Sequence, residues 1–148
     1  MNMDLGSRLR RGPRLLLQAT MVLMMILGAV MILAPMLGEK VFYLVYYQSF
    51  SPPADFSDEA RRYIRFTNAV LGAVMIGWMT LTLWLVNARQ GLPFPLRSAL
   101  LLSFGSWFVV DTTFSAVHGV WGNVVLNVLV AIGTLAPLQF GARAPSTE

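Results

Sequence analysis

The sequence predicts an all-α integral membrane protein, built as a bundle of four transmembrane helices. Of its 148 residues, 56% are hydrophobic and only 12% are charged, whereas soluble domains carry about 25% charged residues. Four segments are long enough to span the hydrocarbon of a bilayer, which takes about 20 apolar residues. These runs are too long and too continuously apolar for barrel strands, and backbone groups in lipid must satisfy their own hydrogen bonds, so we expect helices.

The first predicted span, residues 15–37, follows a basic segment at 1–14 that contains four arginines. Its apolar run exceeds the core of about 7–15 residues that a signal peptide has, and no clear cleavage site follows it, so we expect an uncleaved helix. The remaining spans and the tail are expected at 63–86, 97–117, 119–140 and 141–148.

The connection between the first two spans, 38–62, contains five aromatic residues within the run VFYLVYYQSF. Several of them stand four positions apart, as they would on one face of a helix. We interpret them as rings resting at headgroup depth, and a lid over an outward-facing cavity is the alternative. Pro52 and Pro53 interrupt this run, and Asp55 or Ser57 is then expected to cap a helix that leads into the second span.

The distribution of charge predicts the orientation. The 1–14 segment contains four arginines and one acidic residue, Asp4. The 87–96 connection contains Arg89 and no acidic residue, whereas the 38–62 connection contains both basic and acidic residues. Because basic loops stay in the cytoplasm, we expect both termini there and the 38–62 connection on the outer side.

Composition also excludes several classes of function. The net charge of +4 comes from basic residues beside hydrophobic runs, which indicates headgroup contacts and argues against nucleic-acid binding. The absence of cysteine excludes disulfides and thiolate metal sites within this chain. With one histidine, a mononuclear zinc site from this chain alone is not expected.

Asp111 lies inside the third predicted span. An ionisable side chain there costs about 2.5–3.5 kcal/mol, so it normally faces protein and has a partner. At about 1.5 Å per helical residue, it would lie roughly 10 Å below the outer boundary. Polar residues of three spans fall in the same outer layer, and with an aromatic neighbour they are the candidate site: Arg65, Asn68, Trp107, Asp111, Ser115, His118, Asn123 and Asn127.

We expect Arg65 to pair with Asp111 while the amides of Asn68 and Asn127 donate hydrogen bonds to the carboxylate. One interpretation is that this network only holds helices together, at about 0.6 kcal/mol per hydrogen bond. The other is a pocket open to the outer side, in which Asp111 and His118 contact a ligand or a proton. Clustering at a single depth favours a pocket, and both interpretations stay open at this point.

The chain resembles small bacterial four-helix membrane proteins of the DoxX-like and BphX-like groups in RFTNAVLGAVMIGW and in SWFVVDTTFSAVHGVWGNVVLNVLVAIGTLAPL. The resemblance covers residues 65–138 and rests on Trp107-Phe108, Asp111-Thr112, Phe114-Ser115, Gly119, Asn123 and Asn127. It implies a bacterial inner-membrane location and a four-helix shape. The DoxX name would further imply a subunit of a quinone-linked oxidoreductase, although no cofactor motif stands in the sequence.

The leading hypothesis is a module, surrounded by membrane lipids, that binds a small hydrophobic molecule such as a quinone, a sterol-like compound or a lipid. Asp111, Asn127 and Asn68 would hold its polar end, Arg65 would balance the charge and Trp107 would pack on its body. One alternative is an accessory subunit that assembles with its own copies or with a larger membrane complex. Another is an intramembrane enzyme or proton-coupled carrier that uses Asp111 and His118.

Overall fold

The computed structural model describes residues 9–87 and 94–141, which form five α-helices. They are α1 (Arg11–Leu33), α2 (Pro35–Tyr47), α3 (Asp58–Asn87), α4 (Phe94–Val117) and α5 (Trp121–Phe140). The prediction of an all-α chain is confirmed. The prediction of four helices is wrong, because α2 forms where a connection was expected. Most of the predicted basic segment 1–14, most of the 87–96 connection and most of the 141–148 tail lie outside the described residues.

Four of the described helices, α1, α3, α4 and α5, are long and apolar enough to cross a membrane. In the most apolar part of each, no more than 33% of the residues are buried. Much of the apolar surface of these helices therefore points away from the protein interior.

A proline separates α1 from α2. Ala34 precedes Pro35 and adopts a φ of −127° and a ψ of 64°, because a residue before proline avoids the helical region. Pro35 then occupies the first turn of α2, where its missing N–H leaves no hydrogen bond unmade. The first helix consequently ends at Leu33 and not at residue 37 as predicted.

The segment between α2 and α3 determines where the second long helix begins. Gln48 ends α2 in the left-handed region, with a φ of 53°. The Ser57 hydroxyl accepts a hydrogen bond from the Ala60 N–H at 3.1 Å, which satisfies one of the free donors of the first turn. Of the two predicted caps, Ser57 is therefore the one used, and the helix that leads into the predicted span at 63–86 begins at Asp58.

A tight turn joins α4 to α5. Gly119 has a φ of +72°, a conformation that glycine adopts without the steric penalty of a side chain. As a result α5 begins at Trp121, slightly later than the predicted residue 119.

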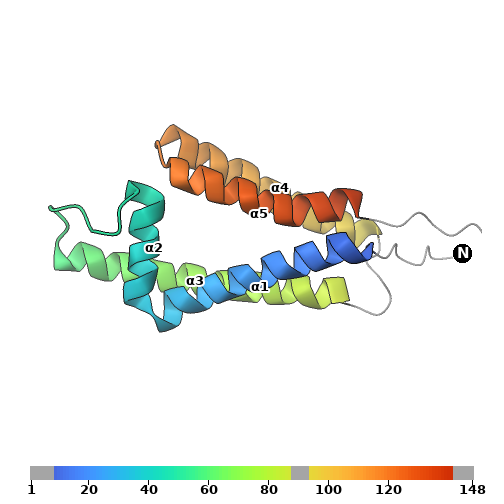
Figure 1. The fold of residues 1–148 in the computed structure, drawn as a ribbon, viewed down its shortest axis with the longest axis horizontal. Coiled ribbons are helices and arrows are strands. Elements are labelled where there is room, and N and C mark those ends of the chain that lie inside the picture. Colours follow the sequence, from blue (N-terminus) through green and yellow to red (C-terminus); the bar gives the residue numbers. More distant parts are fainter. Residues whose placement is uncertain (1–8, 88–93, 142–148) are drawn as a thin grey trace, which may run out of the picture.

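The helices form two antiparallel pairs, α1 with α3 and α4 with α5 (Figure 1). The pairs meet at one end, where the Arg10 N–H donates a hydrogen bond of 2.7 Å to the Gly141 carbonyl oxygen. We call this the terminal end. The pairs separate toward the opposite end, where the short helix α2 lies across the opening (Figure 1). We call that the α2 end.

Packing differs between the two ends. The buried apolar core lies toward the terminal end and comprises Leu17, Met21, Met24, Met79, Val86, Leu100, Phe104, Val130 and Leu138. At the same end the side chains of Arg14 and Gln18 donate hydrogen bonds to Asn87 at 2.8 and 2.6 Å. The α2 end has no comparable core among the described residues, which leaves room for a cavity.

Two glycines bring the backbones of α1 and α3 together. A Cβ atom built on Gly72 would lie 2.5 Å from the Gly28 carbonyl oxygen, and one built on Gly28 would lie 2.7 Å from the Gly72 oxygen. Any larger residue at this crossing would push the two helices apart. Small residues at helix crossings in membranes commonly allow such a close approach of the backbones. Gly77, also on α3, would meet nothing within 4 Å.

We therefore predict that Gly72→Ala destabilises the protein by about 1–3 kcal/mol, as overpacking does. Gly77→Ala, on the same helix, should leave stability within about 1 kcal/mol of the wild type, because Ala is the better helix former. Unfolding in mixed micelles with increasing denaturing detergent measures both variants. Equal effects of the two substitutions would contradict the close crossing.

Candidate functional site

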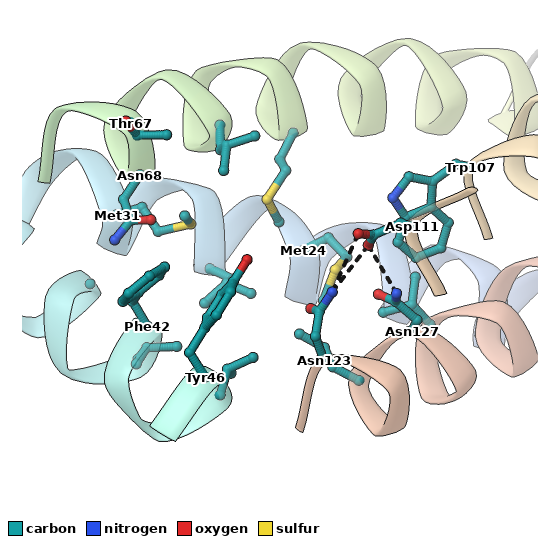
Figure 2. Close-up of a pocket in the computed structure, with 18 of the residues that line it drawn as sticks. Met24, Met31, Phe42, Tyr46, Thr67, Asn68, Trp107, Asp111, Asn123 and Asn127 are labelled. Carbon is teal, nitrogen blue, oxygen red and sulfur yellow. Dashed lines mark hydrogen bonds between the residues drawn. The ribbon is translucent and has the colours of Figure 1, made fainter. Parts of the chain in front are cut away.

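A cavity of about 680 Å³ occupies the space between the two helix pairs, and α2 forms one of its walls (Figure 2). All five helices contribute side chains to it. Its size lies within the range of small-molecule sites, about 300–1,000 Å³. Toward the core, Trp78 of α3 stacks on Phe104 of α4 with 4.7 Å between ring centroids. Both rings line the cavity where it borders the packed core.

The cavity opens sideways between α3 and α4. Leu71 of α3 lines it and is 50% exposed, and Val110 and Phe114 of α4 line it and are 69% and 63% exposed. Because these side chains face both the cavity and the exterior, the opening lies along the long flank of the bundle. The exterior there is the apolar surface of the long helices.

Asp111 lies in the cavity wall within a polar cluster of α4 and α5 (Figure 2). Asn127 donates from Nδ2 to Asp111 Oδ2 at 2.9 Å. Asn123 donates from Nδ2 to the two carboxylate oxygens at 3.4 and 3.3 Å and to Ser115 Oγ at 2.8 Å. We call these four residues the Asp111 cluster. Each donor that reaches the carboxylate is a neutral amide.

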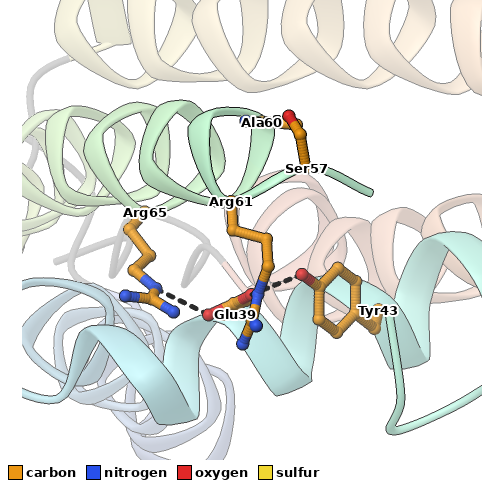
Figure 3. A network of polar contacts seen from close by, with 6 residues as sticks. All are labelled: Glu39, Tyr43, Ser57, Ala60, Arg61 and Arg65. Atoms are coloured by element: carbon orange, nitrogen blue, oxygen red, sulfur yellow. Dashed lines mark hydrogen bonds and ion pairs between the residues drawn. The ribbon is translucent and has the colours of Figure 1, made fainter. Parts of the chain in front are cut away.

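The prediction that Arg65 forms an ion pair with Asp111 is wrong. Arg65 Nε lies 2.6 Å from Glu39 Oε2, and Arg61 Nε lies 2.7 Å from Glu39 Oε1 (Figure 3). Both arginines stand in the first turns of α3, and α2 places Glu39 opposite them. The Glu39 side chain is only 3% exposed. Arg65 therefore neutralises the Glu39 carboxylate of α2 and is not the counter-ion of Asp111.

Glu39 receives a third hydrogen bond, from the hydroxyl of buried Tyr43 (Figure 3). Burial by itself would raise the pKa of Glu39, but the hydrogen bonds from Arg61, Tyr43 and Arg65 outweigh it and lower the pKa from 4.5 to about 2. In turn, burial and the hydrogen bond to Glu39 raise the pKa of Tyr43. Glu39 is thus a charged anchor for α2 across the neutral pH range.

Glu39 and the helix that carries it are absent from the sequence prediction, which treated 38–62 as a connection. Two signals could have found them. Pro35 is a common first residue of a helix, and the aromatic residues from Phe42 to Phe50 follow a helical spacing. Phe42 and Tyr46 from this helix reach into the cavity (Figure 2).

Asn68 does not reach the Asp111 carboxylate as expected. It lies in another part of the cavity wall, beside Met31 and Phe42 (Figure 2). The residue is 4% exposed, and its Nδ2 has no hydrogen-bond partner among the described residues. An unsatisfied buried donor costs about 1–3 kcal/mol. The Nδ2 atom is itself enclosed by protein atoms, so a ligand in the cavity would reach it only after a shift of the side chain.

His118 and Trp107 have different surroundings. The His118 side chain is exposed, stacks on Phe114 at 4.1 Å between ring centroids, and places Nδ1 2.8 Å from the Phe114 carbonyl oxygen. It lies outside the cavity wall. Trp107 does line the cavity, beside Asp111 (Figure 2). Within residues 9–87 and 94–141, no three His, Asp or Glu side chains lie together as a metal site requires.

Comparison of the chain with protein-family models, with curated proteins and with solved structures found no match. The resemblance to DoxX-like proteins therefore stays a prediction from the sequence. Function has to be argued from the cavity and its polar groups.

The Glu39 contacts predict a pH dependence of stability. Because the pKa is lower in the folded protein, the stabilisation is complete above pH 4.5 and is lost as the pH falls toward 2. We expect the free energy of unfolding to decrease by about 1–3 kcal/mol through these contacts over that range.

Detergent-unfolding curves between pH 8 and pH 2.5 measure this change. The Glu39→Gln variant should be less stable at neutral pH. Its free energy of unfolding should also lack the part of the decrease at acidic pH that comes from Glu39. Glu59→Gln, which removes an exposed acid at the start of α3, should follow the wild-type profile. Parallel wild-type and Glu39→Gln profiles would show that Glu39 does not anchor α2 through its charge.

Proposed function

We propose that this chain is a multi-pass membrane protein whose cavity binds a small hydrophobic molecule that carries a polar group. The observation that carries the proposal is the 680 Å³ cavity, with its largely apolar wall and the Asp111 cluster. An apolar cavity with a few polar groups directed into it is the usual form of a small-molecule site.

The membrane location rests on the four long helices and their exposed apolar surfaces. We propose the inner membrane of a bacterium, in keeping with the DoxX-like resemblance of the sequence. The basic residues before α1 favour cytoplasmic termini, which would put α2 and the α4–α5 turn on the outer side. The cavity would then lie in the outer half of the bilayer, with its opening toward the lipid.

Quinones, sterol-like compounds and lipids are the candidate classes of ligand. Asp111, Asn127 and Asn68 would contact the polar groups of the ligand, while Trp107 would pack against its body. A purely structural role for the polar residues explains the hydrogen bonds between α4 and α5. It does not explain the 680 Å³ cavity beside them, which a bound molecule would fill. This difference favours binding over a structural role.

The enzyme or carrier alternative requires Asp111 and His118 to act together. His118 instead lies on the exposed surface and is directed to the backbone of its own helix. The accessory-subunit alternative predicts a companion protein and an unoccupied cavity. The mass of the native assembly therefore separates the accessory subunit from ligand binding.

Filling the cavity from its opening should remove the ligand. Val110→Trp inserts a large ring at a residue that lines the cavity, whereas Val109→Trp alters an exposed neighbour that is not part of the described wall. We expect native mass spectrometry of wild-type protein, extracted from its own membrane into lipid nanodiscs, to detect a stoichiometric ligand. Its occupancy should fall several-fold in Val110→Trp and stay unchanged in Val109→Trp.

Equal occupancy in the two variants would contradict binding in this cavity. A heteromeric mass without a small molecule would favour the accessory subunit. The ligand does not have to be chosen in advance, because the spectrum reports its mass directly.

The chain contains no cysteine, so single cysteines report the orientation without a background signal. In intact cells a membrane-impermeant maleimide should label Ser51→Cys, which lies between α2 and α3. It should label Ser146→Cys, near the carboxyl terminus, only after the membrane is permeabilised. The reverse pattern would place the cavity in the inner half of the bilayer.

A further inference from the structure

The charge in the cavity has no counter-charge among its described neighbours. Of the described residues that line the cavity, Asp111 alone carries a formal charge. Its hydrogen-bond donors, Asn123 and Asn127, are neutral. An unpaired charge in a lipid-facing site is costly, and proteins normally keep one there for a function.

Two arginines at the α2 end, Arg61 and Arg65, cannot serve as that partner without breaking another contact. Arg61 and Arg65 each hold one oxygen of Glu39, at 2.7 and 2.6 Å. Moving either of them to Asp111 would leave a buried carboxylate with a missing partner, which is strongly destabilising. The fold therefore supplies Asp111 with hydrogen bonds and leaves its charge for something that enters the cavity.

Two aromatic rings line the same cavity as this carboxylate. Trp107 lies one helical turn before Asp111 on α4, and Tyr46 extends from α2 into the cavity (Figure 2). Burial and the charge of Asp111 raise the pKa of Tyr46, so its ring stays a neutral phenol. The faces of Trp and Tyr attract a cation that lies within about 6 Å of the ring centroid.

We propose that the ligand is a hydrophobic cation, an amine or quaternary ammonium group on an apolar body, with its charge at Asp111 between Trp107 and Tyr46. This inference rests on the proposed function and specifies the chemical class of its ligand. The apolar body occupies the space toward Leu71 and Met31. A neutral quinone or sterol would leave the charge of Asp111 unpaired, which is why the cation is favoured.

The probes are 4-phenylbutyl-trimethylammonium and the neutral hydrocarbon of the same shape in which carbon replaces the nitrogen. Equilibrium dialysis of protein in nanodiscs of zwitterionic lipid, against empty nanodiscs, measures their binding without attraction from lipid charge. The wild-type protein should bind the cation at least about tenfold more tightly than the hydrocarbon, as an ion pair with aromatic contacts implies. This comparison requires no variant, so a folding defect cannot obscure it.

Asp111→Asn keeps the shape of the side chain and removes its charge. We expect it to weaken binding of the cation at least about tenfold and to leave binding of the hydrocarbon unchanged. Asp55→Asn, which removes an exposed acid outside the cavity wall, should change neither affinity. Trp107→Leu should weaken binding of the cation more than binding of the hydrocarbon.

Equal binding of both probes by the wild-type protein would overturn the cation inference and leave the proposed cavity function in place. Binding of neither probe would also overturn the inference. In that case the native mass spectra of Val110→Trp and Val109→Trp would decide the proposed function independently.

Discussion

The contact of Glu39 with Arg61 and Arg65 is the interaction on which the arrangement of the α2 end depends. It joins α2 to the first turns of α3 through a carboxylate whose two oxygens each meet a guanidinium. Removing one partner of such a buried pair costs about 3–5 kcal/mol, and less here because the arginine side chains are 33% and 32% exposed. The pair holds α2 across the gap between the helix pairs, and it keeps both arginines away from Asp111. The contact thus contributes to covering the cavity, and it engages both arginines with Glu39.

The rest of the architecture follows from where side chains are small and where they are large. Gly28 and Gly72 let α1 and α3 touch backbone to backbone, and apolar residues of four helices fill the terminal end. Beyond the stacked rings of Trp78 and Phe104 no equivalent filling is present in the described part of the chain, and the pairs diverge. A cavity in a small bundle thus arises because one end is packed and the other is spanned by a short helix.

The polar residues of the site could be predicted to different degrees. Asp111, Asn123 and Asn127 lie on helices joined by a tight turn. Their positions along α4 and α5 already placed Asp111 and Asn127 at equal depth, with Asn123 one helical turn nearer to the connection. Their hydrogen bonds follow directly from that local geometry. The partner of Arg65 was mispredicted, because it depends on the position of α2, and no spacing within α3 reports it. The buried, unpaired donor of Asn68 likewise depends on how α3 packs against other helices.

The sequence by itself determined that the chain is all-α, which segments form long apolar helices, and that Asp111 lies in one of them among polar residues. Hydrophobic length and helical periodicity are local properties, so they can be read from the order of residues. Only the tertiary structure decided that Pro35 starts an additional helix, that Arg65 pairs with Glu39 and not with Asp111, and that a cavity separates the two helix pairs. Those features depend on which helix surfaces meet, because a charge pairs with the nearest opposite charge in space, wherever the two residues stand in the chain.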